Sequence, residues 1–485
     1  MYKRTISAAL CVCMAALLLA PAAASAASPA PCACGEVLQV WVDGFGQALF
    51  YDEGTPEEAK APKSDTSQLA ADIPALLLGA LKSVLTCSWT PLVRSLGQLL
   101  LNVMVYYRLD ECGESVAPIT SHWKIDPGQD HATNARYGFR YDFRVDPFDV
   151  AEQLNDFIET LCERTGHEKI ALIGNSEGGV VAMAYLEEYG SARLESLVIV
   201  NGSWQGLTLV GQLLTRQFEI SGPGLANYLA NDDDGSGLLA AGMDVLRTSR
   251  ALDFLPALCR LAMSALGDDL YAEVLMPLFG HMPAIWAFVP DEYYEEAAET
   301  MFGGDPKYDV LRARADRYHY DVMTESPALL AEAMAGGTKV AVVASYGLAP
   351  MPFTRDVLYQ SDGFVDSARE AGGATYAPLG QTLPPGDSEY RSPDGVWDAA
   401  TCILPDQTWF IKGNHHSAGC MQELIDWIIR SEAQPTVWQN DDFPQYLRRT
   451  EDGRRAVPLG TEGPPAVTES FLRAMLEFIR VVIMG

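Results

Sequence analysis

Positive charge and long apolar stretches are scarce in this chain of 485 residues. Lysine and arginine total 34 against 64 aspartates and glutamates, which gives a formal net charge of -30. Such a charge repels nucleic acid and anionic membrane surfaces, so we exclude nucleic-acid binding. Beyond the first residues no segment is long and apolar enough for a transmembrane anchor, and no internal repeat is found. What remains is an ordinary globular composition, with 48% hydrophobic and 20% charged residues.

The first 26 residues show the three-part pattern of a secretory signal peptide. Lys3 and Arg4 are followed by an apolar stretch over 6–19 and a small-residue run that ends at Ala26. The apolar stretch is shorter than the roughly 20 residues of a spanning helix, which argues against the alternative of a membrane anchor. We therefore predict a cleaved signal peptide over 1–26 and a secreted or extracytoplasmic protein.

Cysteine usage agrees with export. Two of the ten cysteines lie in the predicted signal peptide, and eight remain: Cys32, Cys34, Cys87, Cys112, Cys162, Cys259, Cys402 and Cys420. An even number outside the cytoplasm predicts disulfides, although their connectivity cannot be read from sequence. Cys32 and Cys34 are too close in sequence for a comfortable pair, so each is expected to reach elsewhere. No Cys-x-x-Cys pair or nearby histidine completes a zinc set, so no metal and no other cofactor is expected.

Strand and helix patterns alternate over much of the chain. Apolar runs predict strands at 35–42, 137–144, 169–174, 194–200, 338–344 and 408–412. Helical patterns cover 147–163, 177–189 and 421–430, and a further helical stretch at 67–109 is interrupted at Pro74 and Pro91. This alternation predicts an α/β protein with a mostly parallel central sheet flanked by helices.

The alternation stops between 205 and 335, where helical patterns and aromatic residues replace the strands. We interpret this segment as a helical cap inserted between two parts of one catalytic core, 36–204 and 336–431. Residues 432–485 form a carboxyl-terminal extension, with an amphipathic helix expected at 471–484 and a role that the sequence does not reveal.

A candidate nucleophile lies between the predicted strand at 169–174 and the helix at 177–189. Residues 174–178 read Gly-Asn-Ser-Glu-Gly, which matches Gly-x-Ser-x-Gly. In the α/β-hydrolase fold this motif forms a tight strand-to-helix turn that exposes a reactive serine, here Ser176. The alternative is a glycine-rich turn with an inert serine.

A serine nucleophile needs a base to take its proton and an acid to orient that base. In this fold the acid and then the histidine follow the serine in the chain. Only His415 and His416 lie beyond the strand that begins at Thr338. We favour His416, because a helix starts soon after it, and leave His415 open. Asp362, in a turn before a glycine, is the favoured acid, with Asp366 as its rival.

An oxyanion hole needs two backbone donors. The first is the N–H of Glu177, directly after the nucleophile. The second is expected from the turn Asp43-Gly44-Phe45-Gly46 after the first strand, where we favour Phe45. An ordinary tight turn is the alternative.

Five segments resemble the lecithin:cholesterol acyltransferase family of α/β-hydrolases and its bacterial lipase-like relatives, over roughly residues 36–430. They are Tyr-Asp-Phe-Arg at 141–144, the Ser176 turn at 174–179, Gly-Ser-Trp-Gln-Gly at 202–206, the proline-bounded stretch 283–290, and Ser-Asp-Gly-Phe-Val at 361–365. The resemblance implies Asp362 as the acid, Phe45 as an oxyanion donor and a lipid ester as substrate. Asp43 and Glu177 replace residues common in the family and are expected to add negative charge at the site.

The predicted function is that of a secreted serine hydrolase or O-acyltransferase acting on lipid acyl esters, with at most transient contact to a lipid surface. Aromatic residues of the cap, with Trp286 and Phe288 as candidates, would bind the acyl chain. The alternative for them is that they only hold the cap on the core. The alternative functions are a narrow esterase or peptidase of the same fold, or a catalytically silent lipid-binding protein.

Overall fold

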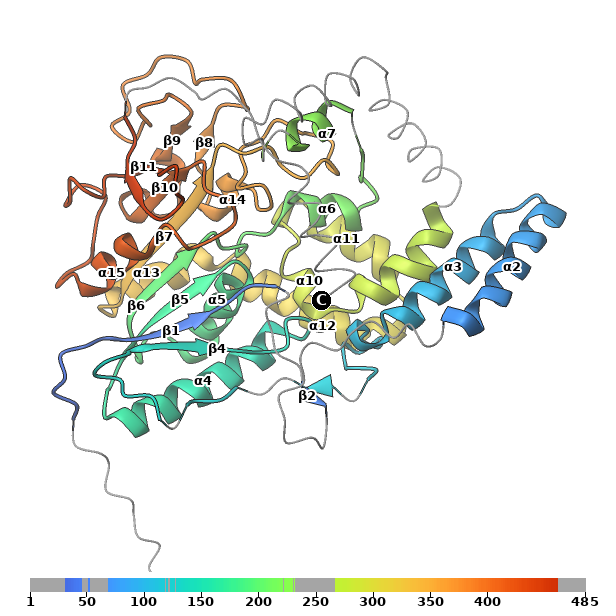
Figure 1. Cartoon of the computed structure of the whole chain (residues 1–485), viewed down its shortest axis with the longest axis horizontal. Coiled ribbons are helices and arrows are strands. Elements are labelled where there is room, and N and C mark those ends of the chain that lie inside the picture. The colour runs from blue at the N-terminus through green and yellow to red at the C-terminus, as the bar shows by residue number, and fades with distance from the viewer. Residues whose placement is uncertain are drawn as a thin grey trace, which may run out of the picture.

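The computed structural model describes residues 31–45, 51–52, 69–117, 119–120, 123–126, 128–220, 222–229, 231 and 267–460 (Figure 1). The predicted signal peptide, the middle of the predicted cap and the predicted helix at 471–484 lie outside these residues.

An eight-stranded sheet forms the centre of the molecule, in the order β12-β11-β10-β7-β6-β5-β1-β4. Its strands are β1 (Leu38–Val42), β4 (Arg136–Phe139), β5 (Ile170–Asn175), β6 (Leu194–Val200), β7 (Lys339–Tyr346), β10 (Thr408–Lys412), β11 (Tyr446–Arg449) and β12 (Ala456–Pro458). Neighbours pair in parallel except β11 with β12. The predicted mostly parallel sheet is confirmed, and the extension after residue 431 adds two strands that the sequence did not predict.

The apolar strands bury side chains on both faces of the sheet. Along β5, Ala171 and Ile173 belong to the core on the side of α15 (Gln422–Arg430). Leu172 belongs to the larger core formed with α4 (Pro147–Thr165) and α5 (Glu177–Tyr189). Strands buried on both faces read as continuous apolar runs, which is why the sequence located them so closely.

Every described element of the predicted cap is helical. These elements are α6 (Thr208–Leu214), α7 (Gly222–Leu229), η3 (Tyr271–Gly280), α10 (Pro283–Trp286), α11 (Asp291–Phe302), η4 (Pro306–Tyr308), α12 (Asp309–Arg317), η5 (Tyr318–Met323) and α13 (Ser326–Ala335). The last of them, α13, packs against β7 and α5, so the end of the predicted insertion covers the sheet itself.

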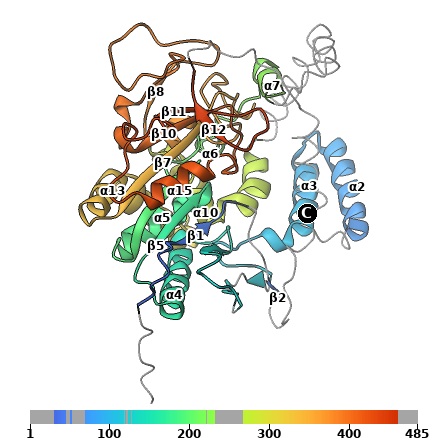
Figure 2. The same ribbon diagram turned by 60° about the vertical axis from the view of Figure 1, so that its left-hand side comes forward.

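Two helices, α2 (Leu69–Thr86) and α3 (Thr90–Val103), form a hairpin that projects from the body in both views (Figures 1 and 2). The interruption predicted at Pro91 lies just before it, since α3 begins at Thr90 with Pro91 as its second residue, but Pro74 lies inside α2 and does not end it. Pro74 is in the second turn, near the amino end, where few helical hydrogen bonds precede it. Among the described residues, no helix combines the length and the apolar composition needed to cross a bilayer.

Short elements complete the described chain. They are η2 (Val105–Tyr107), the pair β2 (Tyr51–Asp52) and β3 (Ile119–Thr120), the pair β8 (Thr375–Tyr376) and β9 (Trp397–Asp398), α14 (Ser367–Glu370), η6 (Ala399–Thr401) and η7 (Pro405–Gln407). The predicted strand over 137–144 ends at Phe139. Beyond it, Asp142 and Arg144 form a buried ion pair with an O–N distance of 2.5 Å, which belongs to a turn rather than to a strand ladder.

The described cysteines are not paired in disulfides as the sequence predicted. The seven that the structure describes are free thiols, and Cys259 lies outside the described residues. The predicted disulfides are therefore not found in the described part of the chain. Cys162, Cys402 and Cys420 are buried, where a free thiol behaves as a small apolar side chain.

Candidate active site

The turn between β5 and α5 holds Ser176 in a strained backbone conformation, with φ 59° and ψ -122°. This turn has no room for a side chain two positions before or two positions after the serine. A Cβ on Gly178 would lie 1.9 Å from the carbonyl oxygen of Val42, and one on Gly174 would lie 2.5 Å from the carbonyl oxygen of Gly178. The glycines of the motif are therefore required by backbone approach, and Ser176 stands at the carboxyl end of the sheet.

Three side chains from distant parts of the chain form a continuous hydrogen-bonded series. Ser176 Oγ lies 2.7 Å from Nε2 of His416, and Nδ1 of the same ring lies 2.5 Å from Oδ2 of Asp362. Of the two adjacent histidines, His416 makes both bonds. Its loop follows β10, and α15 begins six residues later.

The loop after β7 orients Asp362. Gly363 has φ 96°, which lets the chain turn so that Asp362 Oδ1 accepts the backbone N–H groups of Phe364 and Val365 at 2.8 and 2.7 Å. Burial raises the pKa of this carboxyl, but the charge of His416 and its hydrogen bond outweigh burial, so the pKa lies below its usual value. Asp362 is therefore ionised where an imidazolium needs a counter-charge.

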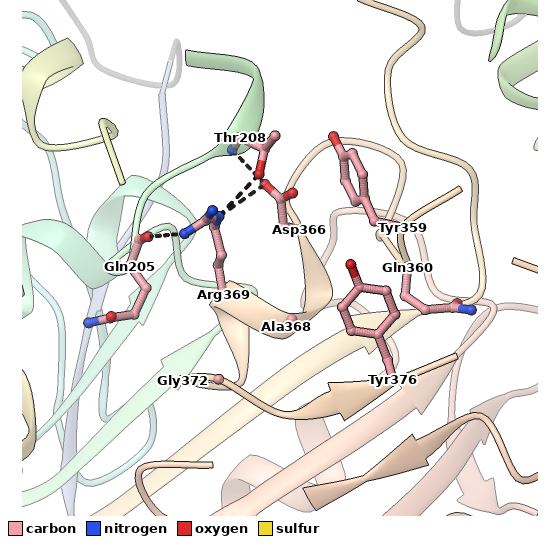
Figure 3. Close-up of a pocket in the computed structure, with 10 residues that line it drawn as sticks. Gln205, Thr208, Tyr359, Gln360, Asp366, Ala368, Arg369, Gly372 and Tyr376 are labelled. Carbon is pink, nitrogen blue, oxygen red and sulfur yellow. Dashed lines mark hydrogen bonds and ion pairs between the residues drawn. The ribbon is translucent and has the colours of Figure 1, made fainter. Parts of the chain in front are cut away.

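The rival acid, Asp366, faces another part of the molecule. Its Oδ2 accepts the backbone N–H of Thr208 at 2.8 Å and lies 3.8 Å from Nε of Arg369. These groups border a cavity of about 320 Å³ (Figure 3). The described residues that line this cavity do not include Ser176, Asp362 or His416. Arg369 is also bonded to Thr208, Gln205 and Glu292, so the cavity wall is a crosslink between the cap and α14.

The turn after β1 lies directly against the nucleophile. A Cβ on Gly44 would be 2.5 Å from Cβ of Ser176, so only glycine fits there. Tyr141 holds this turn, because its hydroxyl donates to the carbonyl oxygen of Asp43 at 2.7 Å. Phe45 follows Gly44, and Glu177 is the first residue of α5, where a backbone N–H has no partner within the helix. Both predicted oxyanion donors thus flank Ser176.

Glu177 departs from the expectation that it adds negative charge. Its side chain is almost fully buried, and burial, together with the charge of Asp142, raises its pKa well above the usual range. Burial also raises the pKa of Asp43, against the opposing charge of Arg140. The raised pKa favours the neutral form of the Glu177 carboxyl, so the site carries less negative charge than its composition suggests.

Sequence reasoning missed a second buried acid next to the series. Carboxyl and ring atoms of Glu370, Asp362 and His416 lie within 4.8 Å of one another. Glu370 Oε2 accepts the backbone N–H of Ser345 at 2.7 Å. Burial, then the charge of Asp362 and a hydrogen bond to it, raise the pKa of Glu370 well above the usual range. The raised pKa favours the protonated form of Glu370, which can donate its proton to Asp362.

A buried polar network joins the carboxyl ends of three strands beneath these loops. Ser345 Oγ, at the end of β7, donates to Asn201 Oδ1 after β6 and accepts from Asn414 Nδ2 after β10, both at 2.8 Å. Asn414 also donates to the carbonyl oxygen of Ser417 at 2.8 Å. These bonds brace both sides of His416. Scattered serine and asparagine residues carry no sequence signal that would have identified them.

The two aromatic residues predicted to bind substrate have different surroundings. Phe288 lies with its ring centroid 6.5 Å from that of Phe45, on the side of the nucleophile turn. Trp286 stacks on Phe302 at 4.3 Å, and its indole N–H donates to the carbonyl oxygen of Gly280. Trp286 therefore has the contacts of a residue that holds the cap together, whereas Phe288, which is also buried, lies near Phe45 of the turn beside Ser176.

The parallel sheet and the strained serine turn agree with a family comparison. Residues 112–239 match the protein family described as alpha/beta hydrolase fold, and this segment contains β4, α4, β5, Ser176 and β6. The chain has the α/β-hydrolase fold. No curated protein matches the chain. A chain in "The crystal structure of Tle4-Tli4 complex" shares 12% identity with it at a TM-score of 0.24, covering 64% of this chain and 75% of that one.

In an α/β-hydrolase the arrangement of Ser176, His416 and Asp362 has a direct chemical meaning. The fold indicates a hydrolase, and the series provides a hydroxyl next to a base that is itself held by an ionised carboxylate. No group in this series requires a metal or an organic cofactor for acyl transfer.

Proposed function

We propose that this chain is a secreted serine hydrolase or O-acyltransferase that acts on lipid acyl esters through an acyl-serine intermediate. The observation that carries the proposal is the hydrogen-bonded series from Ser176 through His416 to Asp362, with distances of 2.7 and 2.5 Å. Its members have the order along the chain that is characteristic of this fold.

The proposed reaction has two halves, and in each of them His416 first accepts a proton and then donates it. Ser176 Oγ attacks the acyl carbonyl carbon while its proton moves to His416 Nε2, and Asp362 stabilises the resulting imidazolium. The backbone N–H groups of Phe45 and Glu177 bind the oxyanion. The alcohol then leaves with the proton from His416. In the second half, water or an acceptor alcohol repeats the sequence on the acyl-serine and releases free Ser176.

Four observations support a lipid ester in an extracytoplasmic setting. Phe45, 39% exposed in the turn beside Ser176, offers apolar surface there, and the buried ring of Phe288 lies with its centroid 6.5 Å away. Helix α2 exposes large apolar side chains, including Leu77, Val84 and Leu85. The segments that resemble the lecithin:cholesterol acyltransferase family, and the signal-peptide pattern at the amino terminus, point the same way.

A fluorophosphonate probe on the purified protein tests the nucleophile. We expect stoichiometric labelling at Ser176 and none in Ser176→Ala, together with a loss of ester hydrolysis of about 10⁵-fold. Circular dichroism of the variant should match that of the wild type. A failure of the folded wild-type protein to label would favour the silent lipid-binding alternative. Aryl esters of increasing chain length then separate a lipid substrate from a narrow esterase.

The adjacent histidines provide a matched pair of variants for the base. His416→Ala should lower kcat/KM by at least about a thousandfold, because the proton acceptor is lost. His415→Ala changes the same loop without removing that acceptor and should cost far less. The reverse ranking would assign the base to His415, and two active variants would refute the proposed mechanism.

A further inference from the structure

Two cysteines and two histidines converge at the end of the sheet that lies away from Ser176. Ligand atoms of Cys32, Cys34, His131 and His167 all lie within 4.8 Å of one another. Sγ of Cys32 is 3.2 Å from Nε2 of His131, and Sγ of Cys34 is 3.4 Å from Nε2 of His167. The two histidine rings have centroids 5.1 Å apart and stand nearly perpendicular, at 89°.

These distances suit four ligands around one tetrahedral ion. Zn²⁺ binds thiolate sulfur at about 2.3 Å and imidazole nitrogen at about 2.0 Å, which places neighbouring sulfur and nitrogen ligands about 3.6 Å apart. Two thiolates with two imidazoles form a donor set that favours zinc, whereas Ca²⁺ and Mg²⁺ require oxygen ligands. Four protein ligands leave no open coordination position, which is typical of a structural rather than a catalytic site.

The backbone around the cysteines is shaped to present their sulfur atoms. The N–H of Cys32 donates to the carbonyl oxygen of Gly166 at 2.9 Å, which ties it to the residue before His167. Gly35 has φ 75°, a left-handed turn that brings the N–H of Glu36 to 3.4 Å from Sγ of Cys34. Such a donor stabilises a thiolate ligand. Nε2 of His167 lies 3.2 Å from the carbonyl oxygen of Glu36, a contact that metal binding would replace.

We propose that Cys32, Cys34, His131 and His167 form a structural zinc site. The sequence suggested no metal, because His131 is 99 residues from Cys32 and His167 is 133 residues from Cys34. Only the pairing of β1 with both β4 and β5 brings the segments together, since each ligand lies just before one of these three strands.

The site would act as a crosslink at the amino ends of three neighbouring strands. The opposite ends of two of them hold the active site, because β1 leads to Gly44 and β5 leads to Ser176. A strand of five residues, such as β1, spans about 17 Å, so the metal would not contact substrate. Its contribution is to hold the strands that position the nucleophile and the oxyanion turn.

Metal analysis of the full chain, produced without a histidine tag in zinc-supplemented medium, tests the site. We expect about one zinc ion per chain after extensive dialysis, and less than about a tenth of that in the double variant Cys32→Ser, Cys34→Ser. The matched control is Cys87→Ser, Cys112→Ser, which removes two free thiols elsewhere and should keep the zinc. Equal zinc in both double variants would mean adventitious metal only and would overturn the proposal.

A second measurement on the wild-type protein covers the case in which the double variant does not fold. Chelation should release the zinc and lower the melting temperature, and added zinc should restore it. Cobalt in place of zinc should give the visible bands of a tetrahedral ion with thiolate ligands. Labelling of Ser176 by a fluorophosphonate should persist in zinc-free protein kept below its melting temperature. Metal-free protein as purified, or a disulfide between Cys32 and Cys34 in zinc-supplemented protein, would refute the site.

Discussion

The buried carboxyl groups around Ser176 have pKa values shifted in opposite directions according to their partners. Asp362 is buried, but His416 keeps its pKa below the usual value. Glu177 and Glu370 are also buried, and burial raises the pKa of each well above the usual range. The site therefore favours the ionised form of Asp362 opposite the histidine and the neutral forms of Glu177 and Glu370. This arrangement stabilises a positive charge on His416 during acyl transfer.

Glu370→Gln tests whether Glu370 acts as a neutral hydrogen-bond donor to Asp362. Glutamine has a similar shape and can donate from its amide while accepting the N–H of Ser345, so kcat/KM near pH 7 should stay within about threefold of wild type. Glu370→Leu removes the donor and should lower kcat/KM by about tenfold or more. Both are measured on a soluble aryl ester.

The pH dependence of Glu370→Gln distinguishes this role from mere packing. Because the folded-state pKa of Glu370 is raised, its contribution to stability is complete below its ordinary pKa and is lost as pH rises through the raised value. Wild-type protein should therefore lose activity and stability at alkaline pH where Glu370 ionises beside Asp362, and Glu370→Gln should not. Identical alkaline profiles of the two proteins would contradict a proton on Glu370.

At the scale of single elements, both ends of helix α4 are set by residues of the local sequence, and one of them, Asp146, is a buried carboxyl. Asp146 caps the helix by accepting the N–H of Phe148 at 3.0 Å, and Pro147 follows in the first turn. Gly166 ends the helix in the left-handed conformation, with φ 73°. Burial of the Asp146 carboxyl, only partly offset by that hydrogen bond, raises its pKa to about 6.

Asp146→Asn should stabilise the protein at neutral pH. A raised carboxyl pKa means that the folded state binds more protons than the unfolded state. The free energy of unfolding of the wild type therefore falls as the pH rises from about 4 to about 6. Asparagine caps as well as aspartate and does not titrate, so its advantage should grow over this range to about 2–3 kcal/mol above pH 7. Urea unfolding at several pH values measures it, and a difference that does not change with pH would refute the shift.

The cap elements allow a test of which aromatic residue borders the substrate. Phe288→Ala should weaken turnover of long-chain esters about tenfold more than turnover of acetate esters, because apolar contacts scale with the buried area of the acyl chain. Trp286→Ala should instead cost about 3–5 kcal/mol of stability and lower both activities equally, since its ring packs on Phe302. Melting temperatures and a chain-length series separate the two outcomes. Equal losses in Phe288→Ala would make Phe288 structural as well.

At the scale of the whole molecule, the α2–α3 hairpin projects from the body (Figure 2) and carries several exposed large apolar side chains. Helix α3 is anchored to the body through Thr90, which donates to Asp269 at 2.6 Å, and Arg94, which pairs with Glu273 at 2.8 Å. Gly79 lets α2 approach α3 closely, because a Cβ there would meet Ser95 Oγ at 2.3 Å. The outer face of α2 leaves Leu77 66% and Leu85 73% exposed. A surface of this kind is typical of contact with lipid or a protein partner.

Leu77→Glu combined with Leu85→Glu tests contact with lipid. Turnover of esters embedded in phosphatidylcholine vesicles should fall about tenfold or more, because each buried leucine contributes about 1.5–3 kcal/mol to adsorption. Turnover of a soluble butyrate ester and the melting temperature should not change, since both side chains are exposed. Val310→Glu on α12, also half exposed, is the control and should affect neither substrate. Equal activity of the double variant on vesicles would assign the hairpin another role.

The sequence by itself determined the strands and helices that build the core. Strands such as β6, at Leu194–Val200, are buried on both faces, and their apolar runs depend only on neighbouring residues. The motif around Ser176 could also be recognised within five residues of chain, although Gly178 is required by the approach of Val42 from β1. The order of motifs in this fold led to Asp362 as the acid. It could not exclude Asp366, because what sets Asp366 apart is its hydrogen bond to Thr208 on α6, far away in the sequence.

Only the tertiary structure decided the choice of base, the pKa of Glu370 and the cluster of cysteines and histidines, because each depends on contacts between distant segments. His416 rather than His415 meets Ser176 because the network of Ser345, Asn201 and Asn414 braces its loop. The raised pKa of Glu370 arises from burial beside Asp362. The approach of Cys32 and Cys34 to two distant histidines arises from strand pairing. The pKa of a buried side chain, its hydrogen-bond partners and its part in a metal site depend on groups far away in the sequence, so the local sequence pattern does not predict them.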